Sequence, residues 1–163
     1  MKKSLWLWAL ALALFLPAQA IRAEGGTSGP VDPAYAAEYE QAVSALLAHT
    51  PGAVVDYALR ERDDGRWQWE LFFSQGASMG VCKVLEDSNT IRKVELYDKA
   101  EGALTADQAV QKLMSEKGAS AIVELDLDRE GGGLYYEGEC EVGGRRYEFE
   151  MADDGSIIEW ERD

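Results

Sequence analysis

The sequence predicts an α+β fold made of two tandem repeats, each with one helix packed on an antiparallel sheet of about four strands. The tripeptide Gln-Ala-Val occurs at residues 41–43 and again at 108–110, both times within apolar residues at helical spacing. Four segments with strand patterns follow each copy. The connections between these segments are short, which forces consecutive strands to pair in antiparallel fashion.

The ends of both helices carry recognisable signals. Asp32-Pro33 is expected to start the first helix, because Asp is a good N-cap and Pro suits the first helical position. Thr105 and Gln108 occupy the reciprocal positions of a capping box at the start of the second helix. Gly52 and Gly118 follow the two helices, where a residue with left-handed backbone often ends a helix.

The strands are predicted from alternation and from aromatic content. They are expected near residues 55–59, 67–73, 81–85 and 91–96 in the first repeat, and near 123–127, 134–138, 147–151 and 158–160 in the second. Trp67, Trp69, Leu71 and Phe73 share one strand face and are expected to form the core beneath the helix. Phe72 has the opposite parity and is expected on the outer face. Each repeat has little core of its own, so the two are expected to pack together.

The N-terminal segment predicts export. Lys2 and Lys3 precede an apolar run from Leu5 to Leu16, and Ala18-Gln19-Ala20 has the pattern of a signal-peptidase site. The run is short for a membrane span, so no stable membrane insertion is expected after cleavage. The predicted organisation is a signal peptide at 1–20, a flexible leader at 21–31, and repeats at 32–98 and 104–163.

Charge and motifs narrow the class of function. The chain has 16 basic and 30 acidic residues and a net charge of −14. Nucleic acid is not expected as a partner, because phosphate binding needs a basic surface. An acidic surface instead favours cationic partners or ions. The sequence contains no recognisable nucleophile–base motif, metal cluster or phosphate loop, so neither an enzyme nor a bound cofactor is predicted.

The second repeat has a helix carrying "TADQAVQKLM" and a closing segment "MADDGSIIEWERD". On these segments it resembles the PepSY domain family, from about Leu104 to Asp163. The first repeat, from about Tyr35 to Tyr97, is a degenerate copy in which Asn89 stands where the second has Gly155. The layout is also similar to that of β-lactamase-inhibitor-like proteins. The resemblance implies an exported or membrane-associated bacterial protein without catalytic residues, from a family that includes modules of secreted metallopeptidase propeptides and for which a protease-inhibitory role has been proposed.

The acidic stretch Asp153-Asp154-Gly155 has three interpretations: part of a calcium loop, a pair of catalytic carboxylates, or a hairpin turn. The turn is favoured, because Asp-Gly between two alternating segments is a hairpin signal and adjacent carboxylates in a tight turn point apart. The first repeat has Ser88-Asn89 at the equivalent place, which keeps a turn but not a carboxylate pair.

Cys82 and Cys140 form an even pair in an exported chain, so a disulfide between them is one prediction and two buried or free thiols are the alternative. Cys140 shares the parity of Tyr136 and is expected to point toward the helix.

The outer face of the second sheet is rich in glutamate. The candidate partner-contact residues are Phe72, Tyr135, Glu137, Glu139, Glu148 and Glu150. The leading hypothesis is an exported, non-enzymatic PepSY-type module that binds a secreted or envelope protein and inhibits or modulates a secreted peptidase. The alternative is an envelope sensor or divalent-cation-binding protein that uses this face, and a merely solvated face is the simplest interpretation.

Overall fold

The fold is α+β, with two helices and two four-stranded antiparallel sheets in residues 31–163, the part of the chain that the computed structural model describes. The predicted signal peptide and residues 21–30 of the predicted leader lie outside these residues. The helices are α1 (Ala36–His49) and α2 (Ala106–Lys117), and a short 3-10 helix, η1 (Pro33–Tyr35), precedes α1. The first sheet contains β1 (Val54–Asp63), β2 (Arg66–Gln75), β3 (Ser78–Leu85) and β4 (Ile91–Asp98) in that order, and the second contains β5 (Ala121–Glu130), β6 (Gly133–Val142), β7 (Arg145–Ala152) and β8 (Ile157–Arg162).

The ends of α2 follow the sequence signals, whereas those of α1 do not: the C-cap of α1 is Thr50, which has a φ of −126°, and not Gly52. The Asp32 side chain accepts a hydrogen bond of 2.9 Å from the Ala34 amide, but it caps η1, and α1 begins only at Ala36. The capping box of α2 is formed: the Gln108 amide donates to the Thr105 hydroxyl, and the Thr105 amide donates to the Gln108 side chain. Gly118 ends α2 with a left-handed backbone, at a φ of 71°.

One face of the first sheet packs on α1, as predicted. Leu46 of α1 lies in one apolar cluster with Trp69, Leu71 and Phe73, all of which are at most 1% exposed. The ring of Tyr39 meets that of Trp69 edge-on, at 5.4 Å between centroids. Trp67, at the end of this series, is only half-buried, and its ring packs against the Arg60 guanidinium at 4.0 Å.

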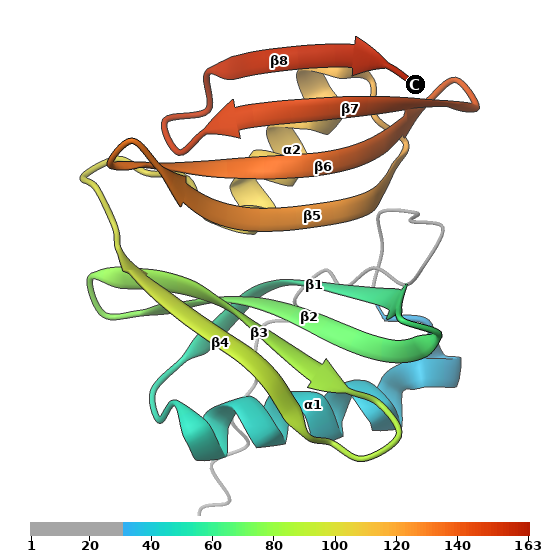
Figure 1. The fold of residues 1–163 in the computed structure, drawn as a ribbon, viewed down its shortest axis with the longest axis vertical. Helices are drawn as coiled ribbons and strands as arrows, with labels where there is room; N and C mark the ends of the chain where they lie inside the picture. Colours follow the sequence, from blue (N-terminus) through green and yellow to red (C-terminus); the bar gives the residue numbers. More distant parts are fainter. Residues whose placement is uncertain (1–30) are drawn as a thin grey trace, which may run out of the picture.

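The other face of the first sheet is buried against the second repeat, which corrects the prediction for Phe72. Phe72 is 1% exposed and lies in a cluster with Tyr57 of β1 and with Val110 and Leu113 of α2. Figure 1 shows the second repeat stacked on the side of the first sheet opposite α1. The alternation placed Phe72 on the correct face of its strand, but that face is internal because α2 packs both on its own sheet and on β1.

A β-bulge interrupts the alternation of β1. The register of β1 on β2 shifts between Val55 and Tyr57, so Val55 packs in the α1 cluster whereas Tyr57 and Leu59 pack toward the second repeat. The bulge therefore places Val55 on the face opposite to that of Tyr57 and Leu59. A simple alternation would have put all three residues on one face.

The turn before the last strand of each repeat confirms the hairpin interpretation. Gly155 has a φ of 87° and Asn89, its counterpart, has a φ of 52°. Both residue types tolerate this left-handed conformation. The Asp154 carboxylate accepts a 2.7 Å hydrogen bond from the Ser156 amide, and this bond holds the pKa of Asp154 below its ordinary value. The two aspartates thus build the turn between β7 and β8.

Candidate functional site

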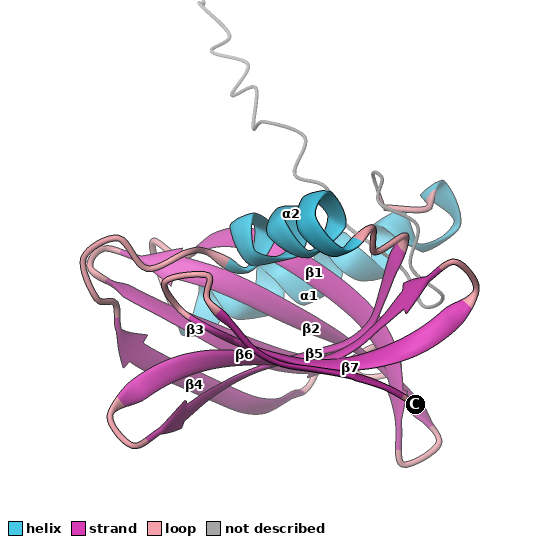
Figure 2. Cartoon of the chain, turned by 90° about the horizontal axis from the view of Figure 1, so that it is seen from above, coloured by secondary structure: helices cyan, strands magenta, loops and turns pink. Residues whose placement is uncertain are grey.

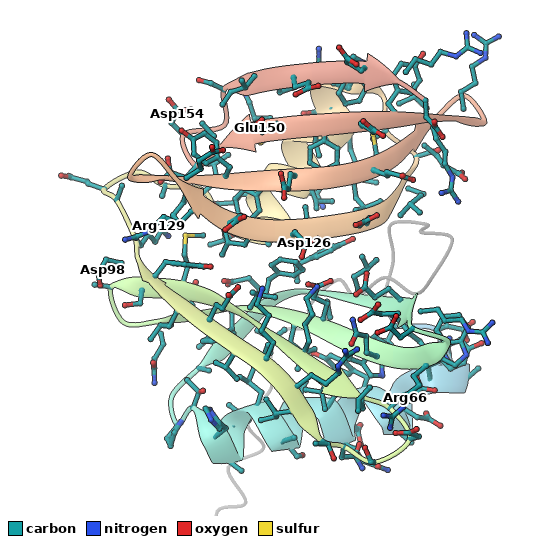
Figure 3. The ribbon with its side chains drawn as sticks, in the orientation of Figure 1. Arg66, Asp98, Asp126, Arg129, Glu150 and Asp154 are labelled. Atoms are coloured by element: carbon teal, nitrogen blue, oxygen red, sulfur yellow. The ribbon has the colours of Figure 1, made fainter. Side chains whose placement is uncertain are left out.

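The second sheet has one face covered by α2 and one face that no helix of the described residues covers. In Figure 2 the sheet is seen nearly edge-on, and α2 lies over one side only. The open side carries eight carboxylates, two from each strand, which we call the acidic face and which are drawn with the other side chains in Figure 3: Glu124, Asp126, Glu137, Glu139, Glu148, Glu150, Glu159 and Glu161. All eight are exposed or half-buried.

The eight side chains form two rows that cross all four strands. In the first row Glu124 is opposite Glu139, Glu139 is opposite Glu148, and Glu148 is opposite Glu161. The second row is Asp126, Glu137, Glu150 and Glu159, with each residue again opposite the next. Side chains directly opposite on neighbouring strands lie about 5 Å apart at Cβ, and like charges there are destabilising. The fold therefore carries an electrostatic cost on this face.

The equivalent face of the first sheet has a different chemistry. A bulge precedes Tyr57 in β1, just as a bulge precedes Glu124 in β5. Tyr57 and Glu124 are therefore equivalent positions, and each row of the second sheet has a counterpart in the first. The counterpart of the first acidic row is Tyr57, Phe72, Val81 and Glu95. Three of its four residues are apolar and are covered by the second repeat. The same face thus binds the other repeat in one copy and stays open and charged in the other.

The surroundings of the face favour proton uptake and cations. Burial, followed by the carboxylates of Asp126 and Glu139, raises the pKa of Glu124 above its ordinary value. Burial, followed by neighbouring carboxylates beginning with Asp128, likewise raises the pKa of Glu137. Each shift means that the site prefers less negative charge, which a bound cation would also supply.

The face is concave at its centre. A shallow depression of about 260 Å³ is lined by seven residues of the two rows together with Gly138 and Phe149. Gly138 is required there, because a Cβ on it would lie 2.1 Å from the carbonyl oxygen of Glu124. The close approach of β5 to β6 next to the bulge depends on this glycine.

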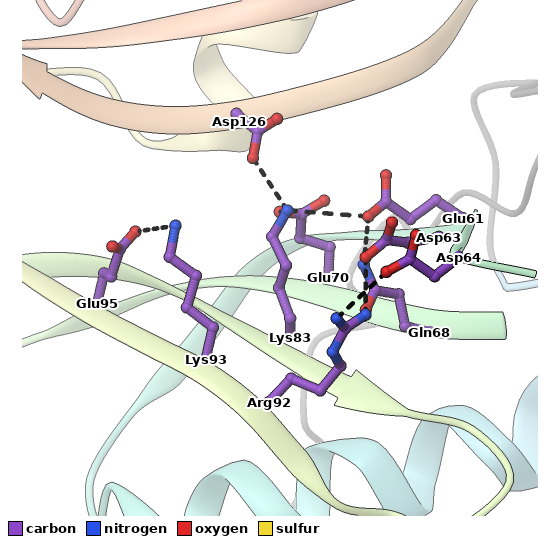
Figure 4. Close-up of polar contacts among 10 residues, drawn as sticks. All are labelled: Glu61, Asp63, Asp64, Gln68, Glu70, Lys83, Arg92, Lys93, Glu95 and Asp126. Carbon is purple, nitrogen blue, oxygen red and sulfur yellow. Dashed lines mark hydrogen bonds and ion pairs between the residues drawn. The ribbon is translucent and has the colours of Figure 1, made fainter. Parts of the chain in front are cut away.

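The first repeat reaches the edge of the acidic face with one lysine. The Lys83 ammonium of β3 lies 2.7 Å from Glu70 Oε1 and 3.1 Å from Asp126 Oδ1, and Glu61 is 3.9 Å away (Figure 4). Glu70 is fully buried, and within residues 31–163 its oxygens have no partner besides this ion pair. Burial, and then the charge of Glu61, raises the pKa of Glu70 well above its ordinary value, whereas Lys83 lowers it. An ammonium group already binds one corner of the acidic face in this chain.

Removing one facing pair of carboxylates should stabilise the protein. The variant Glu137→Gln/Glu150→Gln is expected to raise the free energy of unfolding by about 0.5 kcal/mol at low salt, because the two groups are directly opposite on β6 and β7. Urea denaturation measures this, and the gain should shrink in 0.5 M salt because exposed charges are screened. A loss of stability in both conditions would show that the face does not carry unfavourable repulsion.

The predicted contact residues divide into two groups. Glu137, Glu139, Glu148 and Glu150 lie together as predicted, and the half-buried Tyr135 is in the next row, opposite Asp128 and Ala152. Phe72 is separated from them, inside the core between the repeats.

The prediction omitted Glu124 and Asp126 of β5 and Glu159 and Glu161 of β8, although alternation with the apolar residues of each strand could have identified them. It also omitted Lys83, for which the sequence carries no signal because the contact depends on how the repeats pack.

The two cysteines are free thiols enclosed by different sets of side chains. Cys140 points inward as predicted and lies in the cluster with α2, whereas Cys82 lies in the cluster with α1, and both are fully buried. The disulfide considered from the sequence is therefore not present in this structure. Burial raises the pKa of Cys82 to about 12 and that of Cys140 to about 11.

Both thiols are expected to resist modification in the native state. A thiol-specific reagent should label neither cysteine in folded protein at pH 8 and both after unfolding, because buried thiols with raised pKa values form little thiolate. Mass spectrometry of the labelled full chain, without reductant, gives the count. Absence of labelling after unfolding would indicate a disulfide.

Two further observations concern metal ligands and helix length. In residues 31–163 no group of three or more His, Cys, Asp or Glu side chains is arranged to hold a metal ion. The helices in this part of the chain are also not long and apolar enough to cross a membrane. The carboxylates of the acidic face are spread along rows and do not converge on one point, which suits an extended cationic surface better than a single ion.

Comparison with known proteins identifies both repeats with one family. The family described as "Peptidase propeptide and YPEB domain", or PepSY, matches residues 37–96 and again residues 103–161. Among solved structures, a "putative lipoprotein" from Clostridium difficile 630 matches with 13% identity and a TM-score of 0.42, over 77% of this chain and 92% of that one. No curated protein shows a significant sequence match.

Proposed function

The chain belongs to the PepSY family, and we propose that it is an exported, non-enzymatic module that binds a basic surface of a secreted peptidase and modulates that enzyme. Export is supported by the pattern of the first 20 residues, and the choice of a peptidase is supported by the propeptide modules after which the family is described. The absence of a nucleophile–base motif in the sequence supports a binding role.

The observation that carries the proposal is the pair of carboxylate rows on an open sheet face. In the first repeat the equivalent face is the surface that binds another helix-and-sheet unit. In the second repeat no element of residues 31–163 covers the same surface, which carries eight acids that cost stability unless something compensates them. A complementary basic surface would compensate them, and electrostatic complementarity would also speed its association.

The proposal is tested by capture of exported proteins on immobilised full chain. The test variant neutralises Glu137, Glu139, Glu148 and Glu150 as glutamines. The control variant neutralises four acids away from the acidic face: Glu40→Gln, Asp64→Asn, Glu101→Gln and Glu116→Gln. Both variants lose four negative charges, but at different places on the surface.

We expect a basic exported peptidase to be enriched on the wild type and on the control variant but not on the test variant, and to be released by 0.5 M salt. The activity of the captured peptidase should change when wild-type chain is added. The proposal fails if the captured proteins are the same for all three chains, or if the captured peptidase keeps its activity unchanged.

A further inference from the structure

The edge strand β8 offers backbone groups for a further strand. It is the last strand of the second sheet and pairs only with β7 among the described residues. In Figure 1 no helix or strand of residues 31–163 lies beyond it. Its outer N–H and C=O groups can therefore accept another extended segment, which is the hazard that edge strands normally guard against.

The two faces of β8 specify different chemistry for such a segment. Glu159 and Glu161 end the two rows of the acidic face. Ile157 and Trp160 lie on the other side of the strand, where both pack against the core cluster and Trp160 stacks on Tyr147 at 5.2 Å. Ile158 is the extra residue of a β-bulge between them and is 56% exposed. A neighbouring strand would therefore place alternate residues beside carboxylates and the others beside apolar side chains.

A second copy of the chain is a poor occupant. Antiparallel pairing of two β8 strands would bring Glu159 and Glu161 of one copy against the same carboxylates of the other, which is unfavourable. Lysine or arginine at every second position would instead extend both rows with opposite charge. Within the chain, the contact between Lys83 and Asp126 already shows an ammonium group bound to the acidic face.

We propose that β8 is a strand-addition site for an extended segment of the partner that has Lys or Arg at alternate positions and apolar or β-branched residues between them. This inference rests on the proposed function, and it specifies how the basic partner is bound: the added segment becomes a fifth strand of the second sheet. Main-chain hydrogen bonds give it affinity and the alternating side chains give it specificity.

The first test compares peptides on the full chain. The probe is a seven-residue peptide in which Lys alternates with Val and Thr, and the control has the same composition with its lysines in one block. Two further versions carry N-methyl groups, one on the Lys amides and one on the other amides. Binding is measured by fluorescence anisotropy at low salt, and the protection of residues 157–162 is measured by amide hydrogen exchange.

We expect the alternating peptide to bind at least tenfold more tightly than the block peptide. One of the two N-methylated versions should have an affinity at least tenfold lower than that of the unmethylated peptide. The amides of residues 157–162 should become protected from hydrogen exchange when the alternating peptide binds. Equal binding of all four peptides would overturn strand addition while leaving a basic partner for the acidic face intact. Binding by none of them would also overturn strand addition, and the capture experiment with exported proteins would then decide the proposed function separately.

The second test exchanges charge on the edge. The variant Glu159→Lys/Glu161→Lys should bind the alternating Lys peptide with an affinity at least tenfold lower than that of the wild type. It should gain affinity for a peptide of the same sequence in which each Lys is replaced by Glu. The control Glu40→Lys/Glu101→Lys makes the same change of charge at exposed positions outside the second sheet. Its affinity for the alternating Lys peptide should stay within threefold of that of the wild type. Equal losses in the two variants would overturn the assignment to β8.

Discussion

Replacing Lys83 with methionine is expected to lower the free energy of unfolding by about 3 kcal/mol at neutral pH, because it leaves the carboxyl of Glu70 buried without its cation. The side chain of Glu70 is 0% exposed, and that of Lys83 is 19% exposed. Water therefore cannot replace the lost ammonium. Urea denaturation of the full chain at pH 7 measures the change.

Two variants control this prediction. Lys93 is opposite Lys83 on β4 and pairs with Glu95 at 2.8 Å, but both side chains are substantially exposed, so Lys93→Met should cost only about 0.5 kcal/mol. The double variant Glu70→Met/Lys83→Met removes both charges and should recover most of the loss. If Lys83→Met costs no more than Lys93→Met, the ion pair does not stabilise the junction.

The loss of folding stability caused by Lys83→Met should increase with pH. The folded-state pKa of Glu70 is raised, mainly by burial, so above the ordinary carboxyl pKa the folded chain keeps a proton that the unfolded chain has released. Folding stability therefore falls as pH rises through the raised value. Lys83→Met removes the cation that lowers the pKa of Glu70. The pH range over which folding stability falls therefore extends to higher pH. The substitution should consequently cost more at pH 8 than at pH 5, and an equal cost at both would contradict the assignment to Glu70.

Phe72→Ala is expected to lower the free energy of unfolding by about 3–5 kcal/mol, because it removes a fully buried ring between the two repeats. The ring packs on Tyr57 at 6.1 Å between centroids and belongs to the same cluster as α2. Because that cluster joins both sheets, denaturation should show one transition by tryptophan fluorescence and by far-UV circular dichroism.

Ile158→Ala is the matched control for Phe72→Ala. Ile158 is also a large apolar residue on a strand, but it is 56% exposed, so its truncation should change stability by no more than about 0.5 kcal/mol. Similar effects of the two substitutions, or two separate transitions in the wild type, would contradict a shared core between the repeats.

Local signals accounted for much of the fold. The capping box at Thr105, the turn residues Asn89 and Gly155, and the inward series Trp69, Leu71 and Phe73 could all be predicted, because each depends on neighbours in sequence. The second repeat was easier to interpret than the first for the same reason, since its helix caps and its final turn are complete.

What could not be predicted depends on the packing between repeats. The burial of Phe72 follows from the position of α2, and the contact of Lys83 with Asp126 joins residues of different sheets. The bulges after Val55 and Ile122 reset the alternation of β1 and β5, and nothing in a strict two-residue period indicates where they occur. Half of the acidic face was identified from β6 and β7, and alternation also indicates the acids of β5 and β8. That the eight acids align in two rows depends on the register of all four strands.

The role of the acidic face is tested most directly by titration of isotope-labelled full chain with hexalysine, followed by NMR. If the face is the binding surface, chemical-shift changes should saturate and centre on residues 124–126, 137–139, 148–150 and 159–161. The chain has a net charge of −14, so nonspecific attraction would also bind lysine. Changes of equal size at exposed acids elsewhere, such as Glu40 and Glu101, would contradict a binding site on the second sheet.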